Sequence, residues 1–259
     1  MITTVPLHFK KFGDTGPPLV ILHGLLGSLD NWLTLGRRWA DHFQVYLVDQ
    51  RNHGRSPHTE AFGYPEMAAD LRAFLEDQAL DCPYLIGHSM GGKTLMQYAV
   101  QYPQDCRRMV VVDIAPKQYP IHHDHIMTSL KSLPIKAFSS RQEAEDALAQ
   151  HITEPDVRLF LLKNLYRDAD KSFAWRMNLD VLSRSLPTIS VPVRSEHPVE
   201  VPLLFIGGER SNYLSPSDMP AIRELFPQSE LRMYPTGHWV HAELPDRLYE
   251  DVLDFCYQK

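Results

Sequence analysis

The segment Gly87–Gly92 reads Gly-His-Ser-Met-Gly-Gly and places a serine between two glycines, each two positions away. The apolar run Tyr84–Ile86 before it predicts a buried strand, and the residues Gly91–Tyr102 after it predict a helix. A sharp strand-to-helix turn pushes a side chain out above a sheet, and glycines allow the close backbone contacts that the turn needs. The helix also points its positive N-terminal end toward the serine. The pattern therefore predicts that Ser89 is a nucleophile.

A serine hydroxyl is a weak nucleophile on its own and needs a neighbouring base. With a nucleophile on such a turn, the base is expected last along the chain. The segment Tyr234–Trp239, Tyr-Pro-Thr-Gly-His-Trp, places His238 in a turn after the last expected strand. A loop there can hold an imidazole over the carboxyl edge of the sheet, so we expect His238 to be the base. His241 is the nearby alternative, for which a surface or capping role is expected.

The third member of such a site is a carboxylate that fixes the imidazole tautomer. Its usual place is the turn Gly207–Tyr213, but Ser211 stands where an aspartate would be expected. One strand earlier, the apolar run Met109–Val112 leads directly into Asp113, which should lie at the same sheet edge as the serine. We therefore expect Asp113 to be the acid and Ser211 to be an auxiliary donor to Asp113 or to the imidazole. The alternative acids are Glu209 and Asp218.

Acyl transfer also needs two backbone N–H groups aimed at the developing oxyanion. Met90 follows the serine at the start of a helix, and Leu25 lies in the turn His23–Gly27 after an early strand. We expect these two residues to be the donors. His23, His88 and Trp239 are the expected neighbours in the substrate pocket.

The polar segment Asp49–Ser56 follows another expected strand and should lie near the same rim. We interpret Asp49 and Arg51 as an ion-paired turn, and phosphate contact by Arg51 or Arg55 as the alternative. The sequence contains no glycine-rich phosphate loop, so no nucleotide cofactor is expected.

Short apolar runs alternate with helical patterns in the first half of the chain, and the alternation resumes near its end. Such runs suit strands buried on both faces of a parallel sheet, and strand–helix alternation predicts an α/β fold. The expected strands are Leu19–Leu22, Phe43–Val48, Tyr84–Ile86, Met109–Val112, Val201–Ile206 and Leu231–Tyr234.

The block from residue 117 to residue 198 shows helical patterns and no convincing strand. The expected helices are His122–Leu133, Arg141–His151, Asp156–Arg167 and Phe173–Leu186. A structureless loop of this length is improbable, so we expect a helical cap inserted into a core of residues 1–116 and 199–259. Its apolar side chains should mostly pack between cap and core, with some contacting the ligand: Phe138, Phe160, Leu161, Leu165, Phe173, Trp175, Met177 and Leu182.

The composition excludes several classes of protein. A net charge of -6 gives no electrostatic footprint for nucleic acid, and no apolar run approaches the length of a membrane span. The start of the chain, Met1–Lys11, lacks a signal-peptide core. Three scattered cysteines (Cys82, Cys106 and Cys256) suit neither a disulfide framework nor a zinc site. We expect a cytoplasmic protein without a metal, and the sequence leaves monomer and homodimer open.

Together, the turn His23–Gly27, the segment Asp49–Ser56, the serine motif and Gly237-His238 resemble the α/β-hydrolase superfamily over nearly the whole chain. Within it, the sequence is similar to the bacterial YbfF-type esterases and the related ABHD-type mitochondrial hydrolases. The resemblance implies a mostly parallel sheet flanked by helices, with an inserted helical cap. It also implies an acid in the segment Val112–Pro116, in line with Asp113, and a serine at position 211. Its implied activity is hydrolysis of carboxylic esters of short to medium acyl chains, with acyl-CoA thioesters as further substrates.

The expected reaction is acyl transfer to water through an acyl-enzyme on Ser89. Two alternatives keep the fold: a C–C bond hydrolase, lyase or menaquinone-pathway synthase with the same triad, or a non-catalytic binding or hormone-receptor module. Dehalogenases and epoxide hydrolases of this fold use an aspartate nucleophile, and position 89 is a serine.

Overall fold

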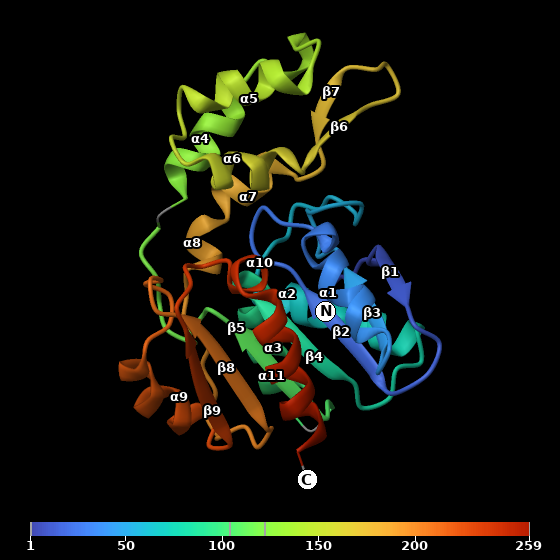
Figure 1. Ribbon diagram of the computed structural model, residues 1–259, viewed down its shortest axis with the longest axis vertical. Helices are drawn as coiled ribbons and strands as arrows, with labels where there is room; N and C mark the ends of the chain where they lie inside the picture. The colour runs from blue at the N-terminus through green and yellow to red at the C-terminus, as the bar shows by residue number, and fades with distance from the viewer. Residues whose placement is uncertain (1, 104, 122, 259) are drawn as a thin grey trace.

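The computed structural model describes residues 2–103, 105–121 and 123–258. Within these residues, a seven-stranded sheet has the order β1-β3-β2-β4-β5-β8-β9, and its strands are parallel except for β1, which pairs antiparallel with β3 (Figure 1). The six expected strands are all present, with ends shifted by at most two residues. The strands are β1 (Phe9–Phe12), β2 (Pro18–Leu22), β3 (Gln44–Val48), β4 (Tyr84–His88), β5 (Arg108–Val112), β8 (Leu203–Gly208) and β9 (Ser229–Tyr234).

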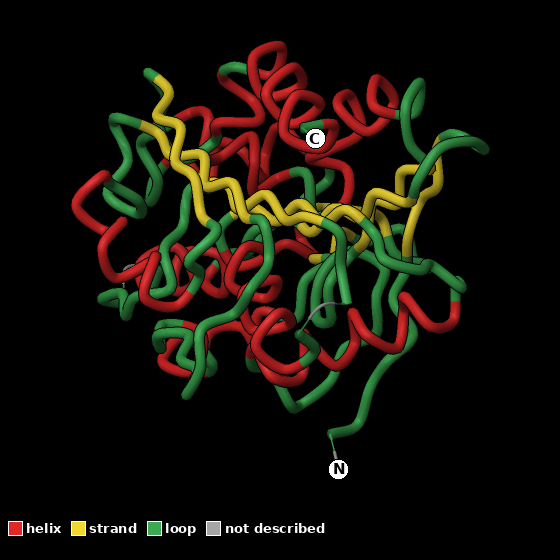
Figure 2. The backbone as a smooth tube through the Cα atoms, turned by 90° about the horizontal axis from the view of Figure 1, so that it is seen from below, coloured by secondary structure: helices red, strands yellow, loops and turns green. Residues whose placement is uncertain are grey.

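Helices cover both faces of this sheet, as Figure 2 shows from below. Alternate residues of each strand point to opposite faces, and in β3 Val45 and Leu47 pack on one side while Tyr46 and Val48 pack on the other. On one face lie α1 (Leu33–Trp39) and α11 (Pro245–Tyr257), and on the other lie α2 (Tyr64–Asp77), α3 (Met90–Gln101) and α9 (Met219–Leu225). This three-layer arrangement is the predicted α/β fold.

A further group of helices stands over the carboxyl edge of the sheet, outside the three layers, at the top of Figure 1. Its helices are α4 (Asp124–Ser132), α5 (Arg141–Ala149), α6 (Pro155–Leu162), α7 (Leu179–Arg184) and α8 (Leu186–Ile189). We call residues 124–189 the helical layer. Its own apolar cluster reaches down to Leu26 and Met90 of the sheet edge, so the layer is packed onto the sheet domain.

The prediction that this layer contains no strand is wrong. Strands β6 (Leu165–Arg167) and β7 (Phe173–Trp175) form an antiparallel hairpin, so the helix expected over Asp156–Arg167 ends at Leu162. The helix expected from Phe173 to Leu186 is instead β7 followed by α7. Strands of three residues are too short to show a periodicity of two. The expected start at His122 lies outside the described residues.

The described residues include no helix with the length and apolar character needed to cross a membrane. They also include no cluster of three or more potential metal ligands. All three cysteines are free, and burial raises the pKa of Cys106 and of Cys256 to about 12.

Candidate active site

Ser89 occupies the turn between β4 and α3, with φ 51° and ψ −117°. A Cβ atom at Gly91 would lie 2.6 Å from the carbonyl oxygen of Leu22, and one at Gly87 would lie 2.5 Å from the backbone of Gly91. The turn therefore needs glycine on both sides, because β2, β4 and α3 approach one another too closely for any side chain. The left-handed φ of a non-glycine residue is costly, and here it presents a half-buried serine at the sheet edge.

His238 and Asp113 meet at the same edge from different strands. The Nδ1 atom of His238 lies 2.7 Å from Oδ2 of Asp113. Asp113 follows β5 with a φ of 52° and is fully buried, whereas the His238 side chain is 24% exposed. The carboxylate accepts two further hydrogen bonds, from the N–H of Gly208 at 2.9 Å and from Oγ of Ser211 at 2.5 Å. These bonds orient the carboxylate, and the carboxylate in turn fixes the imidazole tautomer.

The two alternative acids do not contact the imidazole. Glu209 is exposed, and Asp218 receives the ammonium group of Lys117 at 2.8 Å. The turn that carries His238 is fixed by a hydrogen bond from the Gly237 N–H to the Glu243 carboxylate at 2.9 Å. Among the three candidates, only Asp113 therefore lies against His238.

Ser89 and His238 line one cavity of about 200 Å³, although no hydrogen bond joins them. Asp113 occupies Nδ1, so Nε2 is the imidazole nitrogen left to exchange a proton with a hydroxyl in the cavity. In structures without substrate such contacts are often long and tighten only when the complex forms. The cavity is lined by Gly24, Leu25, Leu26, His88, Ser89, His123, Ile126, Val157, Phe160, Leu161, Tyr213, His238 and Trp239.

Tyr213 is a residue of this site that the sequence prediction missed. Its ring stacks on that of His238 with a centroid distance of 4.2 Å and an interplanar angle of 28°. The Tyr119 hydroxyl donates to the Tyr213 carbonyl at 2.5 Å and anchors this segment. The signal for it was an aromatic residue two positions after Ser211, in the turn where the acid of such a site usually lies.

Of the two expected oxyanion donors, Leu25 lines this cavity and Met90 directly follows Ser89 in the chain. The N–H of Leu26 donates to His53 Nε2 at 3.2 Å, and that of Gly27 donates to the carbonyl of Gly24 at 3.0 Å. Within the described residues, neither Leu25 nor Met90 donates its N–H to another group. Met90 starts α3, where the first N–H groups have no partner inside the helix.

The three expected pocket residues lie in different places. His88 and Trp239 line the cavity, and His88 Nε2 donates to the His238 carbonyl at 2.9 Å. His23 is fully buried beneath the cavity, outside its lining. Its Nε2 accepts from the Gln50 N–H at 3.0 Å, and burial lowers its pKa to about 4. His23 therefore acts as a neutral support for the turn.

The prediction of an ion pair between Asp49 and Arg51 is wrong. Arg51 instead forms a two-pronged pair with Asp70 of α2, at 2.5 and 2.8 Å, and both side chains are 1% exposed. Asp49 accepts the N–H groups of Leu29 and Arg55 at 2.8 and 2.9 Å. A guanidinium so enclosed is unavailable to a phosphate, which excludes Arg51 from such a contact, whereas Arg55 is exposed.

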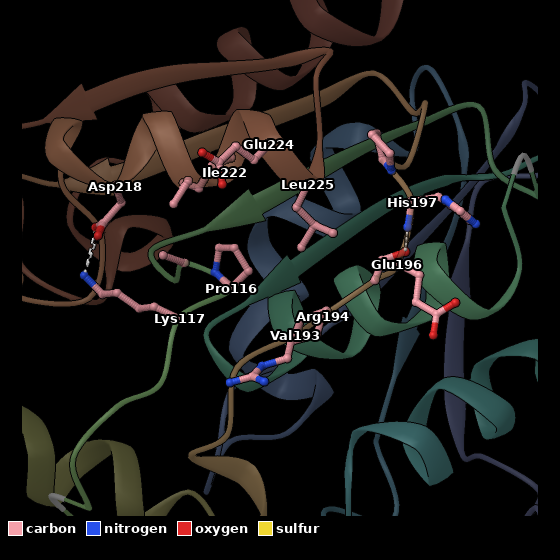
Figure 3. A pocket seen from close by; sticks show the side chains of 14 residues that line it. Pro116, Lys117, Val193, Arg194, Glu196, His197, Asp218, Ile222, Glu224 and Leu225 are labelled. Carbon is pink, nitrogen blue, oxygen red and sulfur yellow. Dashed lines mark hydrogen bonds and ion pairs between the residues drawn. The ribbon is translucent and has the colours of Figure 1, made fainter.

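A second and larger hollow lies away from this chemistry. It measures about 390 Å³ and lies between the segment after β5, the exposed loop through Arg194 and His197, and helix α9 (Figure 3). The ion pair of Lys117 and Asp218 closes one end. Neither Ser89 nor His238 lines this hollow, so it is not the candidate active site.

The fold and this site define an α/β hydrolase. The model of the α/β-hydrolase-fold family matches residues 17–152, and the chain belongs to that family. It is 38% identical to the esterase YbfF of Escherichia coli, over 91% of each chain. It is 37% identical to the sn-1-specific diacylglycerol lipase ABHD11 of Mus musculus, over 97% of this chain and 85% of the relative. A solved marine microorganism esterase superposes with a TM-score of 0.95 at 40% identity, covering 97% of this chain and all of that one. The protein is thus a hydrolase of the esterase and lipase type.

Proposed function

We propose that the protein is a serine esterase that uses Ser89, His238 and Asp113 as a triad and forms an acyl-enzyme. The observation that carries the proposal is the 2.7 Å contact between His238 and buried Asp113, in a cavity shared with Ser89. Ser89 Oγ attacks the acyl carbonyl carbon while His238 Nε2 takes its proton. The N–H groups of Leu25 and Met90 stabilise the oxyanion. The imidazolium then protonates the leaving alkoxide or thiolate, and a water activated by His238 releases the carboxylic acid.

Ser211 is proposed as an auxiliary residue that holds the carboxylate of Asp113. Its hydroxyl and the Gly208 N–H each donate to one oxygen of the buried Asp113 carboxylate, which supports a role in holding that carboxylate in place. The proposed substrates are esters of short to medium acyl chains, with acyl-CoA thioesters as a further class. The names of the relatives, an esterase and a diacylglycerol lipase, support the ester chemistry.

We also propose that residues 117–198 form a cap over a core of residues 1–116 and 199–259. Residues of the helical layer, among them Val157, Phe160 and Leu161, line the cavity opposite Ser89. Of the eight apolar cap residues singled out from the sequence, Phe160 and Leu161 line the cavity and the rest pack in or against the layer's own cluster. Three free cysteines favour a reducing compartment, so we propose a cytoplasmic location.

The decisive experiment measures hydrolysis of p-nitrophenyl butyrate by Ser89→Ala and by three carboxylate variants. Ser89→Ala should lose nearly all turnover and all labelling by a fluorophosphonate probe, with an unchanged circular dichroism spectrum. Asp113→Asn should lose about four orders of magnitude in kcat, because the wrong imidazole tautomer is then favoured.

Glu209→Gln and Asp218→Asn are the matched controls, because each removes one carboxylate that does not contact the imidazole. Both should retain near wild-type turnover. Full activity of Ser89→Ala would exclude the serine mechanism. A larger loss in either control than in Asp113→Asn would reassign the acid.

A further inference from the structure

Ser89 lies at the junction of two cavities. The first, described above, extends beneath α6 and is called the α6 cavity. The second extends beneath α8, measures about 50 Å³ and is called the α8 cavity. Four residues line both cavities: Leu25, Ser89, His123 and Tyr213. The α8 cavity is also lined by Tyr64, Met90, Lys93, Leu186 and Ile189.

The two sides of an ester meet different groups when it reacts at Ser89. The leaving oxygen must receive its proton from His238, which lines the α6 cavity and is absent from the α8 cavity. The alcohol or thiol part therefore belongs in the α6 cavity. The acyl chain extends from the carbonyl carbon in the other direction, past Met90 into the α8 cavity.

The cavities differ about fourfold in volume, at about 50 and 200 Å³. A cavity holds one water molecule for about every 10–15 Å³ of its volume, and a water is about the size of one non-hydrogen atom. The α8 cavity therefore has room for about three to five non-hydrogen atoms of a substrate. On the same scale the α6 cavity takes about thirteen to twenty. The acyl side is thus the smaller of the two.

The walls of the α8 cavity are fixed by hydrogen bonds between segments that are distant in the sequence. The Tyr64 hydroxyl donates to the carbonyl of Ile189 at 2.8 Å, which ties α2 to α8. Lys93 Nζ donates to the carbonyls of Lys117 and Val191 at 2.7 and 2.6 Å, on the two connections to the helical layer. Widening the cavity for a long chain would break these bonds.

The walls of the α6 cavity are mainly apolar and suit a larger group. Phe160 of α6 and Trp239 lie with ring centroids 5.6 Å apart, and Leu161 is 1% exposed. Resting on the proposed serine esterase function, we infer that the protein selects esters that join a small acyl group, of about two to four carbons, to a larger apolar alcohol or thiol.

The test compares two isomeric esters, hexyl acetate and ethyl hexanoate, whose composition is identical and whose acyl and alcohol parts are exchanged. Rates are followed in a pH-stat and divided by the rate of alkaline hydrolysis of each ester. We expect kcat/KM for hexyl acetate to exceed that for ethyl hexanoate by at least about tenfold, because each excluded methylene is worth a factor of ten or more. Equal values, or a preference for ethyl hexanoate, would overturn the inference.

A pair of matched leucine variants locates the selectivity. Leu186 lines the α8 cavity and Leu161 the α6 cavity, and both are buried. Leu186→Ala should reduce the preference for hexyl acetate at least about threefold, since it adds space for several acyl atoms. Leu161→Ala should not reduce it. The opposite pattern would assign the cavities the other way round.

The wild-type ratio alone decides the inference if a variant fails to fold. A different result would contradict the proposed function, namely hydrolysis of p-nitrophenyl butyrate that persists in Ser89→Ala.

Discussion

Lys93 offers a quantitative test of the packing around the site. It lies one helical turn after Ser89 and is 1% exposed, with its ammonium group 4.7 Å from the ring centroid of Tyr119. Its Nζ donates to two carbonyls, those of Lys117 and Val191. Burial lowers the pKa of Lys93 to about 7 from an ordinary value of 10.5.

This depressed pKa makes the free energy of unfolding depend on pH. Below pH 7 the lysine is charged in both states, and the folded state carries the full cost of burying the charge. Between pH 7 and 10.5 the unfolded chain binds a proton that the folded protein does not, so stability rises with pH. From pH 6 to pH 9 the gain is roughly 3 kcal/mol.

The perturbation is Lys93→Met, which keeps the length of the side chain and removes its titration. The lost hydrogen bonds to the two carbonyls shift the stability of the variant by a similar amount at every pH. The wild type should therefore gain roughly 3 kcal/mol relative to Lys93→Met between pH 6 and pH 9, because all other titrating groups are shared.

The assay is urea unfolding of both proteins at pH 6, 7.5 and 9, followed by far-ultraviolet circular dichroism. Parallel stability profiles across this range would refute the reasoning, and would show that the two carbonyls and the aromatic rings hold the ammonium charged. A profile in which the wild type loses stability relative to Lys93→Met as pH rises would show that the charged form is favoured by folding.

Three further substitutions probe the turn of His238, a buried ion pair and a buried histidine. A Cβ at Gly208 would lie 2.2 Å from the carbonyl oxygen of Gly237, so Gly208→Ala should displace the turn of His238, lower ester kcat at least about tenfold and cost about 1–3 kcal/mol in urea unfolding. Asp70→Asn should cost about 3–5 kcal/mol in the same assay, because it leaves the buried charge of Arg51 without its partner. Burial lowers the pKa of His241 to about 3, so the folded state resists its protonation; relative to His241→Phe, the wild type should lose about 2 kcal/mol of stability between pH 7 and pH 5.

Each of these predictions has an outcome that contradicts it. Gly63→Ala is the glycine control, because a Cβ there first meets the flexible end of the Glu66 side chain. An equal loss of kcat in Gly63→Ala would show that the loss in Gly208→Ala does not come from displacing the turn of His238. Asp246→Asn breaks an exposed pair and should cost at most about 1 kcal/mol; a similar cost for Asp70→Asn would mean that Arg51 is solvated. If His241→Phe loses as much stability as the wild type between pH 7 and pH 5, protonation of His241 does not cost the folded state free energy.

The features that the sequence predicted well depend on neighbours along the chain. The glycines around Ser89 are required by contacts of the same strand-to-helix turn, so the motif carries its own geometry. The positions of His238 and Asp113 at one sheet edge followed from the ends of apolar runs, because parallel strands present their carboxyl ends together. The six parallel strands were recognisable for the same reason, since burial on both faces leaves continuous apolar runs.

The features that it did not predict depend on how distant elements dock. Arg51 pairs with Asp70, which is nineteen residues further along the chain in α2. No local sequence pattern determines how that helix is oriented against Arg51. Lys93 is enclosed by the two connections to the helical layer, whose carbonyls at Lys117 and Val191 lie far from it along the chain. The short hairpin of β6 and β7 and the edge strand β1 are stabilised by pairing rather than by a visible periodicity.

The position of the proposed acid has a physical reason in the pairing of β5 with β8. Val112 is in register with Ile206, and the Asp113 N–H donates to the Ile206 carbonyl at 2.7 Å, so the residues after both strands lie at one edge. A carboxylate can reach the imidazole from either strand. When β5 supplies it, β8 must supply donors, which here are the Gly208 N–H and the Ser211 hydroxyl. An aspartate at the position of Ser211 would instead bring a second negative charge against Asp113. The two positions are therefore coupled, and moving the acid to β8 requires changing both.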